Sequence, residues 1–212
     1  PQPAAGPRRS RSGHERAAVT VRVSTAFVVA LALAGCGGAP ADPGPPPDVK
    51  LDQANRAGTQ ALAMDMPTQA VKQYTQALAR AYERDDADAI ADTAYNLALA
   101  QIRAGDPRQA LLTVQRARAE LERRRVAAPA ELALVQAAAA YRNGDKNEAA
   151  TAAQQALQLK AKDPDTVPRA WFIRGLVASE RGDGATLAQA IAAIPPAKQP
   201  DIEADRQELN GR

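Results

Sequence analysis

The only cysteine of the chain, Cys36, is the residue whose type and position most clearly offer chemistry. It follows Leu33-Ala34-Gly35, which ends an apolar run that begins after Arg22. A single thiol has no partner for an intrachain disulfide, so its sulfur is available for another covalent modification. The apolar run, about 12 residues, is shorter than the ~20 helical residues that span a hydrocarbon core. It fits the hydrophobic region of a cleaved export signal, which ends in small residues.

Arg22, the apolar run and the sequence Leu33 to Cys36 resemble, in this order, a bacterial lipoprotein signal peptide that ends in a lipobox. The resemblance implies cleavage between Gly35 and Cys36 and a lipid on the new terminal cysteine. Gly37 stands where an aspartate would imply retention in the inner membrane, so the resemblance implies the periplasmic face of the outer membrane. The alternative is a plain secretory signal or a buried apolar stretch, with Cys36 an ordinary thiol.

Cleavage at that point changes the charge of the chain. The full sequence has 27 basic and 24 acidic residues, and its first 35 residues include five arginines, one glutamate and the only histidine, His14. Removing them leaves 22 basic and 23 acidic residues, a net charge of −1. Nucleic-acid binding requires a basic surface, so we expect no nucleic-acid partner.

A mature chain without histidine and without a free thiol lacks the groups on which several kinds of site depend. This excludes histidine acid–base catalysis, Ser-His-Asp and Cys-His nucleophiles, and metal sites built from His or Cys. Carboxylates remain, so a carboxylate-based hydrolase acting on envelope glycans is the enzyme class left open. We expect no enzymatic activity, no metal and no cofactor other than the covalent lipid on Cys36.

Two segments flank the apolar run. Residues 1–18 are rich in Pro, Arg and Ser and differ from the short basic region of a signal peptide, so we interpret them as an upstream extension within a signal segment of residues 1–35. Residues 36–50 include the sequence GGAPADPGPPPD, in which proline and glycine exclude a helix. We predict a semi-extended tether there.

Residues 51–194 contain an internal repeat. Small residues recur at spacings of 40, 39 and 38 in a first column of Gly58, Ala98, Ala137 and Gly175. Twelve residues after each comes a second column of Ala70, Ala110, Ala149 and Leu187, and seven further on a third of Ala77, Ala117, Ala156 and Ile194. A turn-forming sequence lies between the first two columns each time. We therefore predict four helix-turn-helix units whose helices meet at small residues.

These units resemble tetratricopeptide repeats, most clearly in Tyr95-Asn96-Leu97-Ala98 followed by Gly105-Asp106. The period exceeds the usual ~34 residues, so we expect longer second helices, ending near Arg125 and Lys162. The resemblance implies an all-α, right-handed solenoid of about four hairpins over residues 51–194. A short capping helix, Ile202 to Leu209, is expected within residues 195–212. The alternative is another helical-hairpin solenoid or an irregular helical bundle.

In this family the first helices line a concave groove that binds proteins or peptides. By the resemblance, the groove residues of this chain are Asn55, Thr59, Tyr95, Leu99, Arg103, Leu134, Tyr141, Arg142 and Phe172. Aromatic rings that recur once per repeat beside Arg103 and Arg142 are typical of a peptide-binding surface. The alternative is that these rings pack between repeats.

Together these features predict a non-enzymatic, membrane-tethered adaptor or scaffold of the bacterial cell envelope. It would hold a protein or peptide partner in the groove and contact the membrane through its lipid. A pilotin-like or envelope-assembly role is the leading hypothesis within that class. Two others stay open: a carrier of a small apolar ligand, which requires a closed apolar cavity, and a carboxylate-based hydrolase.

Overall fold

The computed structural model describes residues 47–196 and 199–212, and all regular structure in these ranges is helical. Gly35, Cys36 and the tether up to residue 46 lie outside the described residues. Within the described ranges the helices follow in the order α1 Val49–Ala63, α2 Pro67–Glu83, α3 Ala87–Arg103, α4 Pro107–Arg123, α5 Ala130–Arg142, α6 Lys146–Gln158, α7 Thr166–Arg181, α8 Gly184–Ala193 and α9 Pro200–Asn210.

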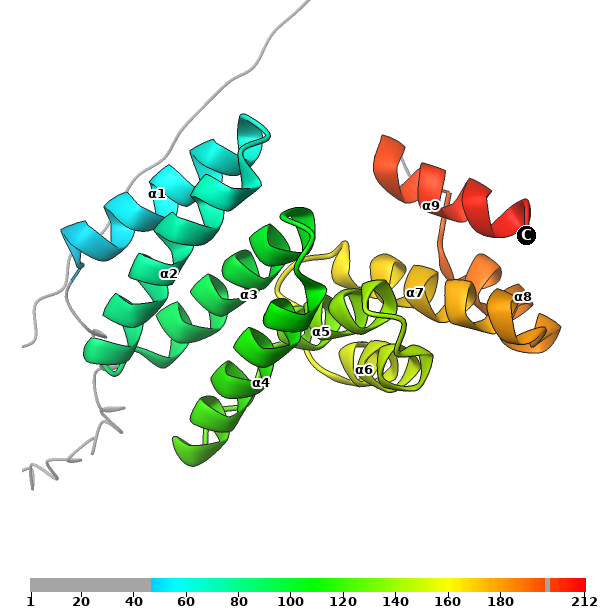
Figure 1. Ribbon diagram of the computed structural model, residues 1–212. Coiled ribbons are helices and arrows are strands. Elements are labelled where there is room, and N and C mark those ends of the chain that lie inside the picture. Colours follow the sequence, from blue (N-terminus) through cyan, green and yellow to red (C-terminus); the bar gives the residue numbers. More distant parts are fainter. Residues whose placement is uncertain (1–46, 197–198) are drawn as a thin grey trace, which may run out of the picture. The chain divides into compact units, whose positions relative to one another are not determined.

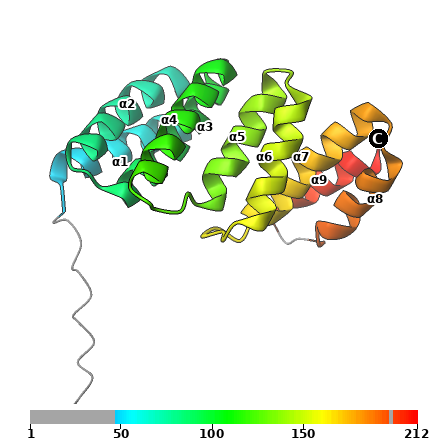
Figure 2. The same ribbon diagram turned by 90° about the horizontal axis from the view of Figure 1, so that it is seen from below.

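Adjacent helices pack against one another in sequence order, as Figures 1 and 2 show. They form the hairpins α1–α2, α3–α4, α5–α6 and α7–α8, and α9 follows as a single helix. The sequence-based prediction of an all-helical, repeat-like fold is confirmed. The turns lie where breaker residues interrupt the helical pattern, because glycine and proline do not continue a helix.

Helices α1, α6 and α9 differ in their bounds from those expected. Helix α1 begins at Val49, two residues before the expected repeat boundary, α6 ends at Gln158 rather than near Lys162, and α9 spans Pro200–Asn210 rather than Ile202 to Leu209. After α6 the chain becomes extended and runs back to α5, where Glu131 accepts hydrogen bonds from the backbone N–H of Lys162 at 2.6 Å and of Asp163 at 2.8 Å. These contacts take the place of the last helical turn.

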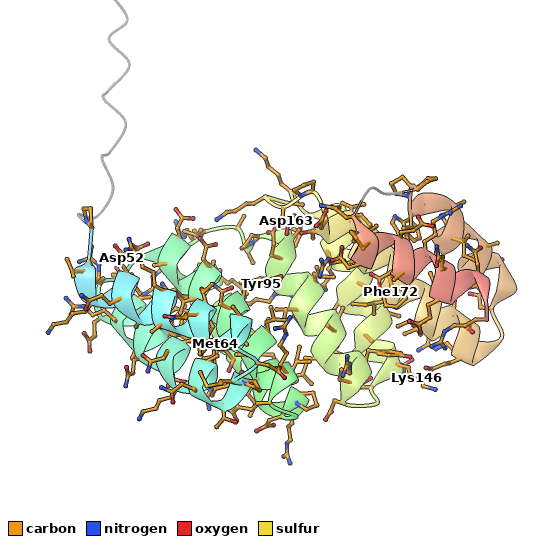
Figure 3. All side chains as sticks on the ribbon, turned by 90° about the horizontal axis from the view of Figure 1, so that it is seen from above. Asp52, Met64, Tyr95, Lys146, Asp163 and Phe172 are labelled. Carbon is orange, nitrogen blue, oxygen red and sulfur yellow. The ribbon has the colours of Figure 1, made fainter. Side chains whose placement is uncertain are left out.

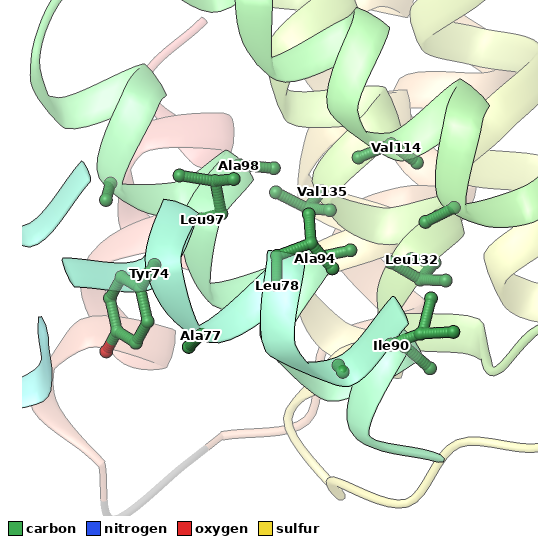
Figure 4. Packing of buried hydrophobic residues seen from close by; sticks show 14 of the residues in the cluster. Tyr74, Ala77, Leu78, Ile90, Ala94, Leu97, Ala98, Val114, Leu132 and Val135 are labelled. Carbon is green, nitrogen blue, oxygen red and sulfur yellow. The ribbon is translucent and has the colours of Figure 1, made fainter. Parts of the chain in front are cut away.

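The columns of small residues lie at the helix contacts. All members are buried except Leu187, which is partly buried. A Cβ added at Gly58 would lie 2.8 Å from the ring of Tyr74, so this glycine is required for the ring to pack between α1 and α2. Figure 4 shows Tyr74, Ala77 and Ala98 within this packed layer. The predicted role of the small residues is confirmed for these hairpins.

The first and second helices of the hairpins form different layers. The first helices contact one another across repeats, α3 with α5 and α5 with α7, whereas no comparable contact joins the second helices among the described residues. Helix α9 extends the first-helix layer, because it packs mainly against α7. A groove between hairpins must therefore be sought on the first-helix layer.

Asp48 fixes the start of the first hairpin. One carboxylate oxygen accepts the backbone N–H of Leu51 at 2.9 Å, and the other lies 2.8 Å from the guanidinium of Arg80 and 3.2 Å from that of Arg84. The hydrogen bonds from Arg80 and Leu51 lower the pKa of Asp48 to about 2. Because the carboxylate form is favoured in the folded state, this stabilisation is present above about pH 4 and is lost as the pH falls towards 2.

The turn between α7 and α8 places two glycines in different backbone conformations. Gly182 has a φ of 71°, in the left-handed region, whereas Gly184 is the first residue of α8. A Cβ at either position would meet no other atom within 4 Å. The two positions therefore differ in backbone conformation and not in space.

We expect Gly182→Ala to lower the free energy of unfolding by about 1–2 kcal/mol, because a side chain disfavours the left-handed region. The matched control, Gly184→Ala, should leave it unchanged or raise it by up to about 0.5 kcal/mol. Urea unfolding of the two variants measures this difference. Equal effects would contradict the conformations assigned to this turn.

Candidate binding groove

A cavity of about 420 Å³ opens on the first-helix layer, between α3, α5, α7 and α9. Its volume lies within the range of about 300–1,000 Å³ that is typical of ligand sites. It is lined by six of the nine residues that the sequence placed in a groove: Tyr95, Leu99, Leu134, Tyr141, Arg142 and Phe172. Figure 3 shows Tyr95 and Phe172 on the face that also carries α9. We call this cavity the first-helix groove.

The aromatic rings of the groove both pack and line it. Tyr95, Tyr141 and Phe172 are partly buried, and each contacts a hydrophobic cluster of its repeats while bordering the cavity. The two alternatives for these rings, that they line the groove or that they pack between repeats, are therefore compatible. A ring held from behind by core contacts presents a rigid apolar surface to a ligand.

Three residues expected in the groove lie elsewhere. The Asn55 side chain accepts a long hydrogen bond from Thr93, 3.4 Å, and the Thr59 hydroxyl shares a hydrogen bond of 2.9 Å with the Tyr74 hydroxyl. Arg103 is exposed in the last turn of α3 and does not line the cavity. The cavity begins at α3 because α1 contacts α3 less closely than α3 contacts α5.

The hydroxyl groups of the two groove tyrosines differ in their surroundings. Burial raises the pKa of Tyr95. Burial also raises the pKa of Tyr141, and the hydrogen bond that its hydroxyl donates to Glu180 adds to the effect. Glu180 is in turn 2.6 Å from Lys146, which lowers the pKa of Glu180. This chain of contacts links α5, α6 and α7 and fixes the orientation of the Tyr141 ring.

Four charged residues line the groove that the sequence analysis did not place there: Arg169, Asp205, Glu208 and Arg212. The last three come from α9 and its end. A helical pattern in the sequence separates the buried Ile202 and Leu209, seven residues apart, from the polar residues of this helix. That pattern identifies the polar face, but the element that the face meets depends on how α9 docks on α7.

Asp205 is distinguished among these charges by its lack of a direct partner. Glu208 pairs with Arg212 at 2.7 Å and Arg169 pairs with Asp201 at 2.5 Å, whereas Asp205 forms no hydrogen bond or ion pair with a described residue. Burial raises the pKa of Asp205 to about 6, the carboxylates of Asp201 and Glu208 add to the rise, and Arg169 opposes it. A half-buried carboxyl without a partner is typical of functional sites.

A second, wider cavity of about 750 Å³ lies over α4, α5 and α6. Arg118 donates hydrogen bonds to Gln136 and to Gln155, the latter at 3.0 Å, and Gln136 donates to Glu148. These polar groups satisfy one another, so they join the second hairpin to the third. The first-helix groove, with its apolar rings and unmatched charge, is therefore the candidate site.

The described residues contain no group of three or more His, Cys, Asp or Glu side chains placed to hold a metal ion. No helix within the described ranges has the length and apolar character required to cross a membrane. No protein-family model matches the chain, and no curated protein matches it.

We expect Asp205→Asn to stabilise the fold at neutral pH and not at acidic pH. The pKa of about 6 exceeds the ordinary value of ~3.9, so stability falls as the pH rises from about 4 to about 6. Discounted for solvent screening, the asparagine variant should gain about 1 kcal/mol in free energy of unfolding above about pH 7.

Urea unfolding at about pH 4 and about pH 7.5 measures this effect, because the difference between variant and parent cancels the titration of other groups. Glu122→Gln, which removes a charge from an exposed residue of α4, is the matched control and should change little at either pH. A loss of stability in Asp205→Asn at both values would show that the carboxylate has a favourable partner.

Proposed function

We propose that this protein is a lipid-tethered adaptor of the bacterial cell envelope that holds a segment of a partner protein in its first-helix groove. The observation that carries the proposal is that residues of three successive hairpins, Tyr95, Leu134 and Phe172 among them, converge on one open cavity. Apolar rings with adjacent arginine side chains are the groups that dominate binding energy at protein interfaces.

The family and the location belong to the same proposal. Helical hairpins in sequence order, with small residues at their contacts, support a tetratricopeptide-like, right-handed solenoid. The sequence from Leu33 to Cys36 supports a lipid anchor at the periplasmic face of the outer membrane. An anchor of two or more acyl chains gives stable attachment where a single chain does not. A pilotin-like or other envelope-assembly role fits this arrangement.

The form of the cavity favours an adaptor over a carrier of a small apolar ligand. A carrier must shield its ligand from water, so its cavity is closed and apolar. The first-helix groove opens to solvent and is bordered by charged side chains, including Arg142 and Asp205. An open groove with polar edges suits an extended segment, whose backbone remains hydrogen-bonded to water or to the groove.

The positions of the groove carboxylates argue against a glycan hydrolase. Such an enzyme needs two carboxyl groups on opposite sides of the scissile bond. Asp205 and Glu208 line the groove three residues apart in α9, so both approach a ligand from the same side. Glu208 is moreover paired with Arg212. We therefore assign Asp205, whose pKa is raised by burial, to ligand binding and not to catalysis.

A photoreactive amino acid placed at Ala138 in the groove should crosslink a partner protein in living cells. The same group at Arg116, exposed on α4, is the matched control and should give little product. Combining the Ala138 probe with Phe172→Ala should reduce the yield at least about fivefold, because an anchor of the groove is removed. Equal products from both positions would contradict binding in the groove.

We expect Cys36→Ser to release the protein from the membrane fraction, because serine cannot carry the thioether-linked lipid. The measurement is fractionation together with the mass of the purified chain. Gly38→Ser, which keeps the cysteine and the residues before it, is the control and should stay in the membrane fraction. Membrane retention of the Cys36→Ser variant would contradict the anchor while leaving the groove function intact.

A further inference from the structure

Helix α9 forms the acidic wall of the first-helix groove. Ile202 and Leu209 on one face of the helix are each 1% exposed and attach it to α7 and α8. A Cβ at Gly175 of α7 would lie 2.5 Å from Leu209, so the two helices are in close contact. Helix α9 is therefore a fixed part of the groove. Figure 3 shows Phe172 of α7 beside this helix.

Most of the charged residues around the groove are engaged in ion pairs. The lining has three arginines, Arg142, Arg169 and Arg212, and two carboxylates, Asp205 and Glu208, while Asp165 and Asp201 lie outside it as ion-pair partners of Arg169. Three of the carboxylates are engaged, two with Arg169 and one with Arg212. Among the described residues, Arg142 and Asp205 are left without an ion pair.

Burial decides which of these two charges a ligand would recognise. Arg142 is exposed and hydrated, and an ion pair with an exposed group contributes little. Asp205 is half-buried, so its charge is poorly hydrated and a cation beside it is favoured more strongly. Tyr95 and Phe172 border the same cavity, and aromatic rings attract apolar and cationic groups.

We propose, on the basis of the groove function above, that the bound segment of the partner carries a lysine or arginine next to an apolar residue. The basic side chain meets Asp205 on α9, and the apolar side chain lies against Tyr95 and Phe172. The observation behind this is one half-buried, unpaired carboxylate at the edge of an aromatic cavity. Charge complementarity thus selects a basic and apolar segment over an acidic one.

The test uses three capped tetrapeptides in which apolar residues alternate with lysine, with glutamine or with glutamate. Binding to the full chain carrying Cys36→Ser is measured at low ionic strength from the NMR shifts of groove residues. We expect the lysine peptide to bind at least about tenfold more tightly than the glutamate peptide, with the glutamine peptide between them. Asp205→Asn should reduce this preference to less than about threefold, whereas Glu122→Gln should leave it unchanged.

The outcomes separate the inference from the proposed function. Equal binding of the three peptides, tighter binding of the glutamate peptide, or an unchanged preference in Asp205→Asn would overturn the inference and leave the groove function standing. Failure of all three peptides to shift the groove residues, combined with no crosslink at Ala138, would overturn both. A crosslinked partner whose captured segment lacks lysine and arginine would also overturn the inference.

Discussion

The close approach of paired helices at small residues is the constraint on which the rest of the structure depends. Where Gly58 faces Tyr74 within the first hairpin, and where Gly175 of α7 faces Leu209 of the terminal helix α9, even one added carbon would overlap a neighbouring side chain. The alanines of the other columns act in the same way with less extreme geometry. Because the two helices of a hairpin lie close together at small residues, the first helices of successive hairpins contact one another and enclose a groove. The groove is therefore a result of the same residues that stabilise the fold.

The sequence predicted the helices well because their signals are local. Turn residues such as Gly105-Asp106 and the spacing of the small columns identify four hairpins without knowledge of their packing. The end of α6 was placed too late because Glu131, distant in sequence, binds the backbone after it. Six of the nine predicted groove residues line the cavity, since they follow the repeat. Asn55 was wrongly placed in the groove and Asp205 was missed, because their surroundings depend on how closely the terminal helices α1 and α9 dock.

The groove combines features that stabilise the protein with one that does not. Tyr95 and Phe172 are packed from behind and so contribute to folding while they face the cavity. Asp205 is half-buried without a counter-ion, which costs stability in the unbound state. Residues that lower stability are retained in proteins where they serve binding or catalysis. The carboxylate that lowers stability thus lies in α9, after the last hairpin, and not in the central hairpins of the repeat.

The attachment of Asp48 to Arg80 and Arg84 has a mechanical consequence. The carboxylate caps α1 and is tied to the last turn of α2, so the chain entering the first hairpin is held by both helices. A pulling force on the preceding segment is thus shared with α2 before it acts on the first hydrogen bonds of α1. The force therefore acts on both helices of the hairpin at once, which opposes unfolding of α1 from its first residue. Tension on the entering chain is therefore delivered to the packed repeats as a unit.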